Sequence, residues 1–216
     1  MFNTVILGST GTGKTEKAKE AYDKAKRCFV FDYQNSGDWN HVPLYNQRAF
    51  QNKCRITRKM GYNYSDFIEI VEKEYFRKGA TIILEESKGL FPSNQLDQRV
   101  NDFLLSCRHN LVNFVFMFHG ADQIPPFIMN YCDIVVLKRI DANEEMLRKK
   151  FNKQVYECSL ECKEDVRKTF VIGVSNKTHG IFFTEYFKGE TLQEKLMSGK
   201  ITEESNDKIK SKNNEI

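Results

Sequence analysis

The chain contains 216 residues, of which 40% are hydrophobic, 12% aromatic and 29% charged. This length suits one domain with a sizeable core, and the apolar content is too high for an intrinsically disordered chain. Its 33 Lys and Arg residues against 29 Asp and Glu residues give a net charge of +4, far from the strongly basic balance of a nucleic-acid coat protein. We expect neither a secretory leader nor a membrane span, since no apolar run approaches the ~20 residues that a span needs.

Short apolar runs of strand length alternate along the chain with stretches of helical periodicity. In chain order we expect a strand over residues 4–7, a helix over 14–27, strands over 28–31 and 54–57, a helix from an N-cap at Ser65 to residue 78, a strand over 81–84, a helix over 98–108, and strands over 113–118 and 133–137. Such alternation is typical of an α/β fold whose mostly parallel sheet has helices on both faces.

The pattern changes after residue 140. A charged helix is expected near residues 144–164, and strands over 169–174 and 181–187 flank a polar turn, which predicts an antiparallel hairpin at the sheet edge. From Ser198 onward large apolar residues are nearly absent, which predicts disorder over about the last 18 residues. We therefore divide the chain into a globular domain over residues 1–187 and a polar extension over 188–216.

Residues 8–15 match the phosphate-binding loop pattern G-x-x-x-x-G-K-[ST]. The loop residues are Gly8, Ser9, Thr10, Gly11, Thr12, Gly13, Lys14 and Thr15. The glycines let successive backbone N–H groups point at phosphate oxygens, and the helix that begins near Gly13 adds its positive N-terminal end. In this pattern the Lys14 ammonium bridges the β- and γ-phosphates and the Thr15 hydroxyl binds Mg²⁺. Since the motif follows a strand and opens a helix, the sequence predicts a P-loop NTPase that uses ATP and Mg²⁺.

The expected strand over residues 81–84 ends in two carboxylates, Glu85 and Glu86, which is the arrangement of a Walker B motif. We expect Glu85 to hold Mg²⁺ through water and Glu86 to be the general base that polarises the attacking water. Asp is usual at the first position, and the extra methylene of Glu85 demands a different reach to the metal. An exchange of the two roles therefore stays open.

Together with these motifs, the strand that ends in Phe31-Asp32 and the run from Phe103 to Ile140 resemble the HerA/FtsK superfamily of ring-forming, DNA-pumping ATPases. In size and layout the chain is similar to the small genome-packaging ATPases of tailless icosahedral viruses with double-jelly-roll capsids, over residues 1–187. The resemblance implies hydrolysis of ATP coupled to translocation of double-stranded DNA without sequence preference. It also implies a homo-oligomeric ring, contacts with capsid or vertex proteins, and a location in the host cytoplasm or on the virion.

The resemblance implies two further catalytic residues. Members of the family carry a polar sensor, usually Gln, at the end of the strand after Walker B, and here His119 follows the strand over residues 113–118. Histidine can donate a hydrogen bond to a phosphate oxygen, but unlike Gln it titrates near neutrality. Arg108 aligns with a basic position of the family and is our first choice for the arginine that completes a neighbouring subunit's site, with Arg139 as the alternative.

Lys88 and the basic stretch over residues 48–59 are candidate DNA contacts, although neither forms a recognised DNA-binding motif. Two other functions stay open. A small-molecule or nucleotide kinase needs an acceptor pocket and usually an Arg-rich lid, whereas the tandem acids favour water as the acceptor. A zonular-occludens-like phage assembly NTPase usually carries a membrane helix, which the sequence does not predict.

Overall fold

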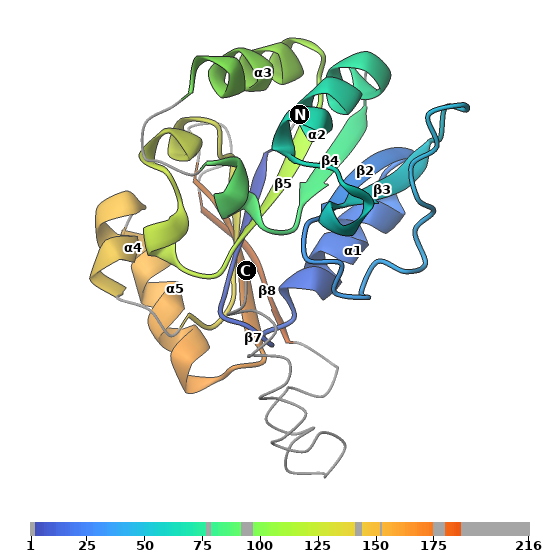
Figure 1. Ribbon diagram of the computed structural model, residues 1–216. Coiled ribbons are helices and arrows are strands. Elements are labelled where there is room, and N and C mark those ends of the chain that lie inside the picture. Colours follow the sequence, from blue (N-terminus) through green and yellow to red (C-terminus); the bar gives the residue numbers. More distant parts are fainter. Residues whose placement is uncertain are drawn as a thin grey trace.

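The computed structural model describes residues 3–76, 79–91, 97–140, 144–151, 153–174 and 180–186. These residues form an eight-stranded sheet in the order β3-β2-β4-β5-β1-β6-β7-β8 (Figure 1). The strands are β1 (Thr4–Leu7), β2 (Arg27–Asp32), β3 (Lys53–Thr57), β4 (Ala80–Leu84), β5 (Asn113–Phe118), β6 (Ile134–Leu137), β7 (Lys168–Gly173) and β8 (Gly180–Tyr186). Neighbours from β3 to β6 are parallel, whereas β7 is antiparallel to β6 and β8. The predicted α/β fold, with a mostly parallel sheet and an antiparallel hairpin at its edge, is confirmed.

Helices cover both faces of this sheet. They are α1 (Lys14–Lys24), α2 (Tyr64–Ile70), α3 (Gln98–His109), α4 (Glu144–Lys150) and α5 (Lys153–Glu164), together with a π-helical segment η2 (Val71–Tyr75) and the short 3₁₀ helices η1 (Arg58–Met60), η3 (Ser87–Leu90), η4 (Ala121–Gln123) and η5 (Pro126–Asn130). Helix α1 lies on one face, and α2 to α5 contribute to the core of the other (Figure 1). None of the described helices is long and apolar enough to cross a membrane.

The buried apolar residues form two clusters, one on each face of the sheet, because successive side chains of a strand point in opposite directions. In β1, Val5 and Leu7 belong to the cluster shared with α2 to α5, whereas Ile6 belongs to the cluster shared with α1. In β4, Leu84 joins the first cluster and Ile83 the second. The two residues that follow Leu84 are Glu85 and Glu86, and their side chains also go to opposite sides. The candidate site therefore has two separate carboxylates.

Two predicted helices differ from those observed. Helix α2 is capped by Asn63, not by Ser65, because the Asn63 side chain accepts from the N–H groups of Ser65 and Asp66 while the Asp66 carboxylate accepts from the Asn63 N–H. This reciprocal capping box satisfies more donors than a cap at Ser65 would. The single charged helix expected over residues 144–164 is two helices, α4 and α5, and no Gly or Pro at the break would have predicted it.

Several boundaries also shift by a few residues. The helix expected over residues 14–27 ends at Lys24, since β2 already begins at Arg27. The helix predicted to reach residue 78 continues from α2 into η2 and ends at Tyr75. The turn between β7 and β8 and the polar extension over 188–216 with its predicted disorder lie outside the described residues.

Candidate functional site

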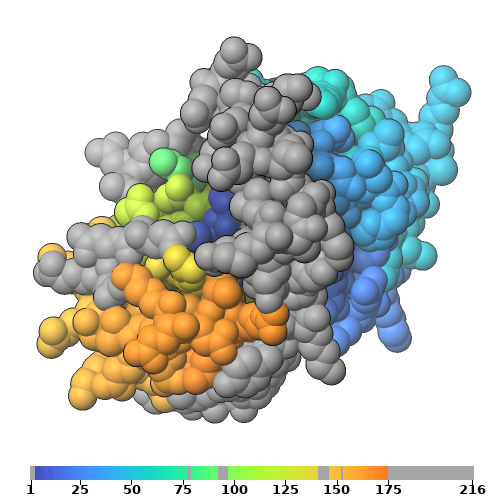
Figure 2. Space-filling model, turned by 90° about the horizontal axis from the view of Figure 1, so that it is seen from below, coloured from blue at the N-terminus to red at the C-terminus, as the bar shows by residue number. Residues whose placement is uncertain are grey.

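The topology brings the predicted motifs to one edge of the sheet. Strands β1, β4 and β5 are parallel, so the segments that follow their last residues lie at the same edge. Strand β5 lies between β1 and β4, which places His119 between the phosphate loop and the two glutamates. Figure 2 views this edge, where the dark blue N-terminal segment lies beside the yellow-green and yellow segments that follow β5 and β6. Ligands of open α/β sheets bind at the carboxyl ends of the strands, which is the edge where these motifs lie.

The phosphate loop connects β1 to α1 in a tight turn. Gly11 and Gly13 have φ angles of 78° and 81°, a left-handed conformation that glycine adopts without strain. The Ser9 N–H donates to the Arg139 carbonyl at 2.8 Å, which fixes the loop to the segment after β6. Gly8 is required for this close approach, because a Cβ there would lie 2.9 Å from the Cβ of Lys138. Helix α1 then begins at Lys14, so its free N–H groups face the loop.

Lys14 is buried within this loop. Its Nζ donates to the carbonyls of Gly8 and Ser9 at 2.7 and 2.9 Å and lies 3.2 Å from Nδ1 of His119. Burial lowers the pKa of Lys14 to about 8, and the nearby carboxylates of Glu86 and Glu85 oppose that shift. An ammonium group with so little hydration interacts strongly with an anion that enters the loop.

Glu86 lies on the side of His119 that faces away from the phosphate loop. Its Oε2 is 3.4 Å from Nε2 of His119 and accepts from the Gln34 amide at 3.4 Å. An ammonium group can only donate, so Nδ1 of His119 accepts from Lys14 and the Nε2–H donates to Glu86. The Tyr64 hydroxyl fixes the Glu86 backbone by donating to its carbonyl at 2.6 Å. Three predicted catalytic residues, Lys14, Glu86 and His119, are thus in contact.

Glu85 points to the other face, towards the segment that follows β2. Its Oε1 accepts from Nε1 of Trp39 at 3.3 Å and from the Ser36 hydroxyl at 3.5 Å. Its Oε2 is buried and has no hydrogen-bond partner among the described residues. Burial, followed by the adjacent carboxyl of Asp32, raises the pKa of Glu85 to about 9.

Glu85 and Thr15 suit a magnesium ion by their chemistry. Mg²⁺ prefers oxygen ligands, and an unpartnered buried carboxylate oxygen is a group that a cation would satisfy. A divalent ion beside Oε2 would also offset the repulsion between Glu85 and the adjacent carboxyl of Asp32, which pairs with Arg55. The Thr15 hydroxyl is on the first turn of α1, the helix that packs on the same face as Ile83 and therefore as Glu85.

The two candidate arginines lie in different places. Arg108 is exposed near the end of α3, shortly before β5 begins, so it is at the edge of the sheet opposite the phosphate loop (Figure 1). It does not reach the site of its own chain. Arg139 follows β6 and its carbonyl accepts from Ser9, so it lies beside the phosphate loop of the same chain.

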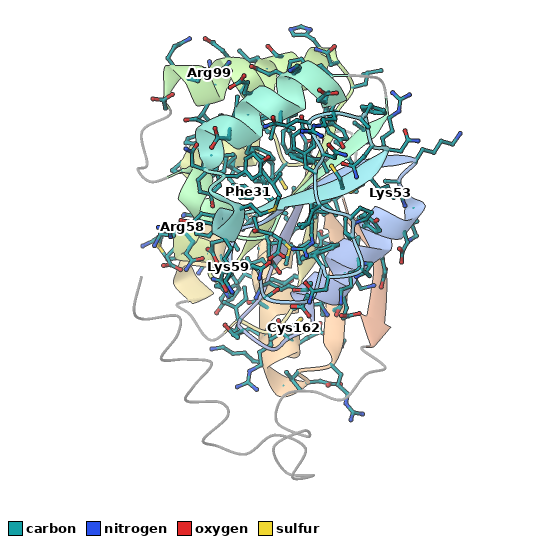
Figure 3. All side chains as sticks on the ribbon, turned by 45° about the vertical axis from the view of Figure 1, so that its right-hand side comes forward. Phe31, Lys53, Arg58, Lys59, Arg99 and Cys162 are labelled. Atoms are coloured by element: carbon teal, nitrogen blue, oxygen red, sulfur yellow. The ribbon has the colours of Figure 1, made fainter. Side chains whose placement is uncertain are left out.

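The basic stretch over residues 48–59 does not form one surface. Arg55 is buried, and Lys53 donates to the Tyr22 carbonyl at 2.7 Å, near the end of α1. Arg58 and Lys59 are exposed at the other end of β3 from Lys53 (Figure 3). Lys88, in η3 directly after the two glutamates, is also exposed.

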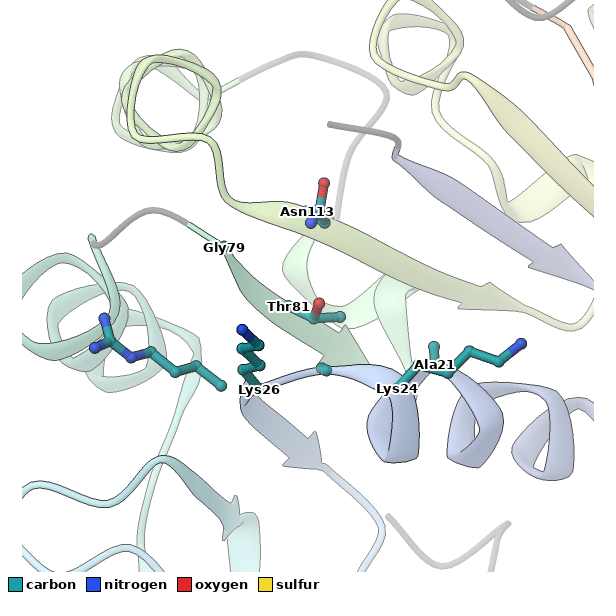
Figure 4. Close-up of a pocket in the computed structure, with 8 residues that line it drawn as sticks. Ala21, Lys24, Lys26, Gly79, Thr81 and Asn113 are labelled. Atoms are coloured by element: carbon teal, nitrogen blue, oxygen red, sulfur yellow. The ribbon is translucent and has the colours of Figure 1, made fainter.

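A pocket of about 450 Å³ lies away from this site, at the amino ends of β2, β4 and β5 (Figure 4). It is lined by Ala21, Lys24, Ala25, Lys26, Arg27, Gly79, Thr81 and Asn113. None of the predicted site residues belongs to it.

Sequence reasoning did not identify the side chains that hold the two glutamates. They are Trp39 and Ser36 around Glu85, and Gln34 and Tyr64 around Glu86. Three of them follow β2 within a few residues, at the same sheet edge as the phosphate loop. The sequence contained one signal for these side chains. The segment that follows the parallel strand β2 is polar and contains the chain's single tryptophan.

Several solved structures of genome-packaging NTPases have this fold. The genome packaging NTPase B204 from Sulfolobus turreted icosahedral virus 2, in complex with sulfate, has a TM-score of 0.65 and 13% identity, covering 88% of this chain and 96% of that chain. Its complex with AMPPCP gives a TM-score of 0.63 at 14% identity, over 88% of this chain and 98% of that chain. B204, the DNA-packaging ATPase from Sulfolobus Turreted Icosahedral Virus, gives 0.62 at 11% identity, with coverages of 88% and 98%.

The chain matches no protein-family model and no curated protein in sequence. At these identities the structural similarity shows the fold alone, and that fold is the one of these genome-packaging NTPases. The resemblance inferred from the sequence motifs is confirmed at that level.

Proposed function

We propose that this chain is an ATPase that couples ATP hydrolysis to translocation of double-stranded DNA during packaging of a viral genome. The contact of Lys14, His119 and Glu86 at the ends of adjacent strands carries the hydrolase part of the proposal. The fold shared with genome-packaging NTPases, one of them in complex with AMPPCP, supports the coupling to DNA.

In this mechanism the phosphate loop binds the triphosphate through its backbone N–H groups and Lys14. Thr15 and Glu85 would hold a Mg²⁺ ion, which would supply positive charge beside the bound phosphates. Glu86 Oε2 accepts a proton from the water that attacks the γ-phosphate in line. His119 orients Glu86 through its Nε2–H and is adjacent to Lys14, where the γ-phosphate would bind.

We favour hydrolysis over transfer to an organic acceptor because two consecutive carboxylates follow β4 and the second, Glu86, is partly exposed to water. The Glu86 side chain is 19% exposed and that of His119 is 36% exposed, so water reaches the proposed base directly. A kinase instead needs to exclude water from the same position.

The position of Arg108 supports action between subunits. An exposed arginine at the edge opposite the phosphate loop can complete only another subunit's site, which requires a ring or another head-to-tail assembly. We assign to Arg108 the stabilisation of transition-state charge in the neighbouring subunit. The exposed Arg58, Lys59 and Lys88 are the proposed contacts to DNA phosphates, with capsid or vertex proteins as further partners.

The test is phosphate release by the full chain in ATP and Mg²⁺, with and without duplex DNA. We expect hydrolysis that duplex DNA accelerates and that Lys14→Ala abolishes, while Lys19→Ala, at a surface pair with Glu16, is unaffected. Sedimentation with ATP and Mg²⁺ should show a ring. Transfer of phosphate to a nucleoside would establish a kinase instead, and hydrolysis unaffected by DNA would overturn the translocase.

A further inference from the structure

The chain's only tryptophan is buried beside the proposed metal ligand. Trp39 is 0% exposed and packs edge-on against Tyr22 of α1, with 5.9 Å between ring centroids. Its Nε1–H donates to Oε1 of Glu85 at 3.3 Å. A buried indole N–H needs an acceptor, and here the acceptor is the carboxylate at the end of β4. The hydrogen bond therefore links the core under α1 to the candidate site.

The loop that carries Trp39 is fixed by one buried guanidinium group. Arg55 of β3 forms an ion pair with Asp32 at 3.1 Å, at the end of β2. It also donates to the Asn35 and Asn40 side chains at 3.2 and 3.1 Å and to the Val42 carbonyl at 3.1 Å. These partners precede and follow Trp39 in the chain, so the rigid fork of Arg55 fixes both sides of the loop.

The two carboxylate oxygens of Glu85 have different hydrogen-bond surroundings, which indicates that the side chain is held in one orientation. Oε1 is held by Trp39 and Ser36, whereas the buried Oε2 has no partner among the described residues. Glutamate has one more rotatable bond than the aspartate usual at this position, and leaving that bond free would cost entropy when a metal binds. A donor that holds one oxygen removes this freedom and leaves the other oxygen for a ligand.

We propose that Trp39 is a positioning residue that orients Glu85 for Mg²⁺, and that Arg55 fixes the loop that carries it. The indole N–H holds Oε1 so that Oε2 is presented to the ion. This inference rests on the proposed function, in which Glu85 binds Mg²⁺. One consequence is that the emission of the single tryptophan reports the state of that carboxylate.

The first experiment titrates Mg²⁺ into the full chain with bound ADP while tryptophan emission is recorded. We expect Mg²⁺ to change the emission of the wild-type chain and of Glu86→Gln, but not that of Glu85→Gln. Glu86→Gln is the matched control, since it makes the same chemical change one residue away on the other face. A response that persists in Glu85→Gln, or is absent from the wild type although ADP binds, would overturn the inference.

Binding of a fluorescent nucleotide and phosphate release, measured on the same samples, separate this inference from the proposed function. Nucleotide binding and hydrolysis without the tryptophan response would leave the proposed function standing and reject the role of Trp39. Absence of nucleotide binding would overturn both.

The second experiment uses Trp39→Phe, which keeps an aromatic ring against Tyr22 and removes the N–H donor. We expect the Mg²⁺ concentration for half-maximal hydrolysis to rise about five- to tenfold, as for the loss of one hydrogen bond, with kcat at saturating Mg²⁺ changed less than about twofold. In a Glu85→Asp background the same substitution should have a smaller effect, because aspartate has no extra bond to fix. An equal loss of kcat at every Mg²⁺ concentration would mean that Trp39 only packs the core.

Discussion

Glu85 and Glu86 are consecutive residues at the end of β4, yet their carboxylates lie in opposite surroundings. Glu85 is enclosed by Trp39, Ser36 and Asp32, and its pKa is raised to about 9. Glu86 is open to water and is approached by His119 and Gln34. Both residues lie in the bend that directly follows β4, and their side chains go to opposite sides of it.

The comparison shows how one strand end can supply two different carboxylates. Acid–base chemistry at a single site requires two carboxyl groups whose different surroundings give them different roles. The enclosed side depends on packing and on buried charge, so substitutions there should act mainly on stability and metal binding. The open side depends on contacts with water and His119, so substitutions there should act mainly on turnover.

Glu86→Gln should have the largest effect, on turnover. Loss of a general base lowers the rate about 10²- to 10⁴-fold, while the amide keeps the shape of the side chain. Phosphate-release assays should show this loss, with nucleotide affinity and melting temperature unchanged. If ATP turnover were retained, the assignment of Glu86 as the base would be wrong.

Arg55→Met should have the largest effect on stability. The substitution leaves the Asp32 carboxylate, which is 0% exposed, without its ion-pair partner, and breaking a buried pair costs about 3–5 kcal/mol. Urea unfolding measures the loss. The control is Arg48→Met in an exposed loop, which should change the free energy of unfolding by less than about 0.5 kcal/mol. Equal losses of unfolding free energy for Arg55→Met and Arg48→Met would mean that the buried surroundings of Glu85 are no more sensitive to substitution than the exposed surface.

Lys138→Met extends the comparison to a buried cation and should be stabilising. Burial lowers the pKa of Lys138 from 10.5 to about 8, with Lys17 adding to the shift and Cys162 and Glu20 opposing it. The folded state therefore disfavours the ammonium form at neutral pH. After allowing for the lost hydrogen bond to the Thr169 hydroxyl, we expect a gain of about 1–3 kcal/mol at pH 7.

The pH dependence of this gain gives a second measurement. Between pH 8 and 10.5 the unfolded chain binds more protons at Lys138 than the folded chain, so wild-type stability gains from rising pH in this window. The advantage of Lys138→Met should be constant below pH 7, shrink above pH 8 and reverse near pH 10.5, where only the lost hydrogen bond to Thr169 remains. Unfolding curves at these pH values measure it, and a pH-independent difference would mean that burial of the ammonium group is not the cause.

Tyr64→Phe should have the smallest effect, and it falls on the open side. It removes the hydrogen bond to the Glu86 carbonyl, which is worth about 1 kcal/mol. We expect turnover to fall by up to about fivefold in phosphate-release assays. Tyr62→Phe is the control, since its ring contacts Tyr45 away from the glutamates. A loss as large as that of Glu86→Gln would mean that Tyr64 acts in the chemistry itself.

Local patterns predicted the parts of the site that are contiguous in sequence. The spacing of Gly8, Gly13 and Lys14 and the apolar strand before Glu85 are short-range features, and both strands lie where the periodicity placed them. The position of His119 followed from the end of another apolar strand. Each of these predictions needed only a few neighbouring residues.

Contacts between distant segments could not be predicted in this way. Trp39 lies 46 residues from Glu85 in sequence, and nothing local indicates that its indole points at that carboxylate. Arg55 looks like one more basic residue of a basic stretch until β3 pairs with β2 and buries it beside Asp32. The cap at Ser65 was wrong for a related reason, because Asn63 competes for the same backbone donors.

The pairing of β1 has a consequence for synthesis of the protein. Thr4 pairs with Val115 in β5 and with Ile134 in β6, so β1 waits for neighbours more than a hundred residues later in the chain. Pairings of such long range form slowly. The hydrogen bond from the Ser9 N–H to the Arg139 carbonyl, which fixes the phosphate loop, can therefore form only after the segment that follows β6 has been translated.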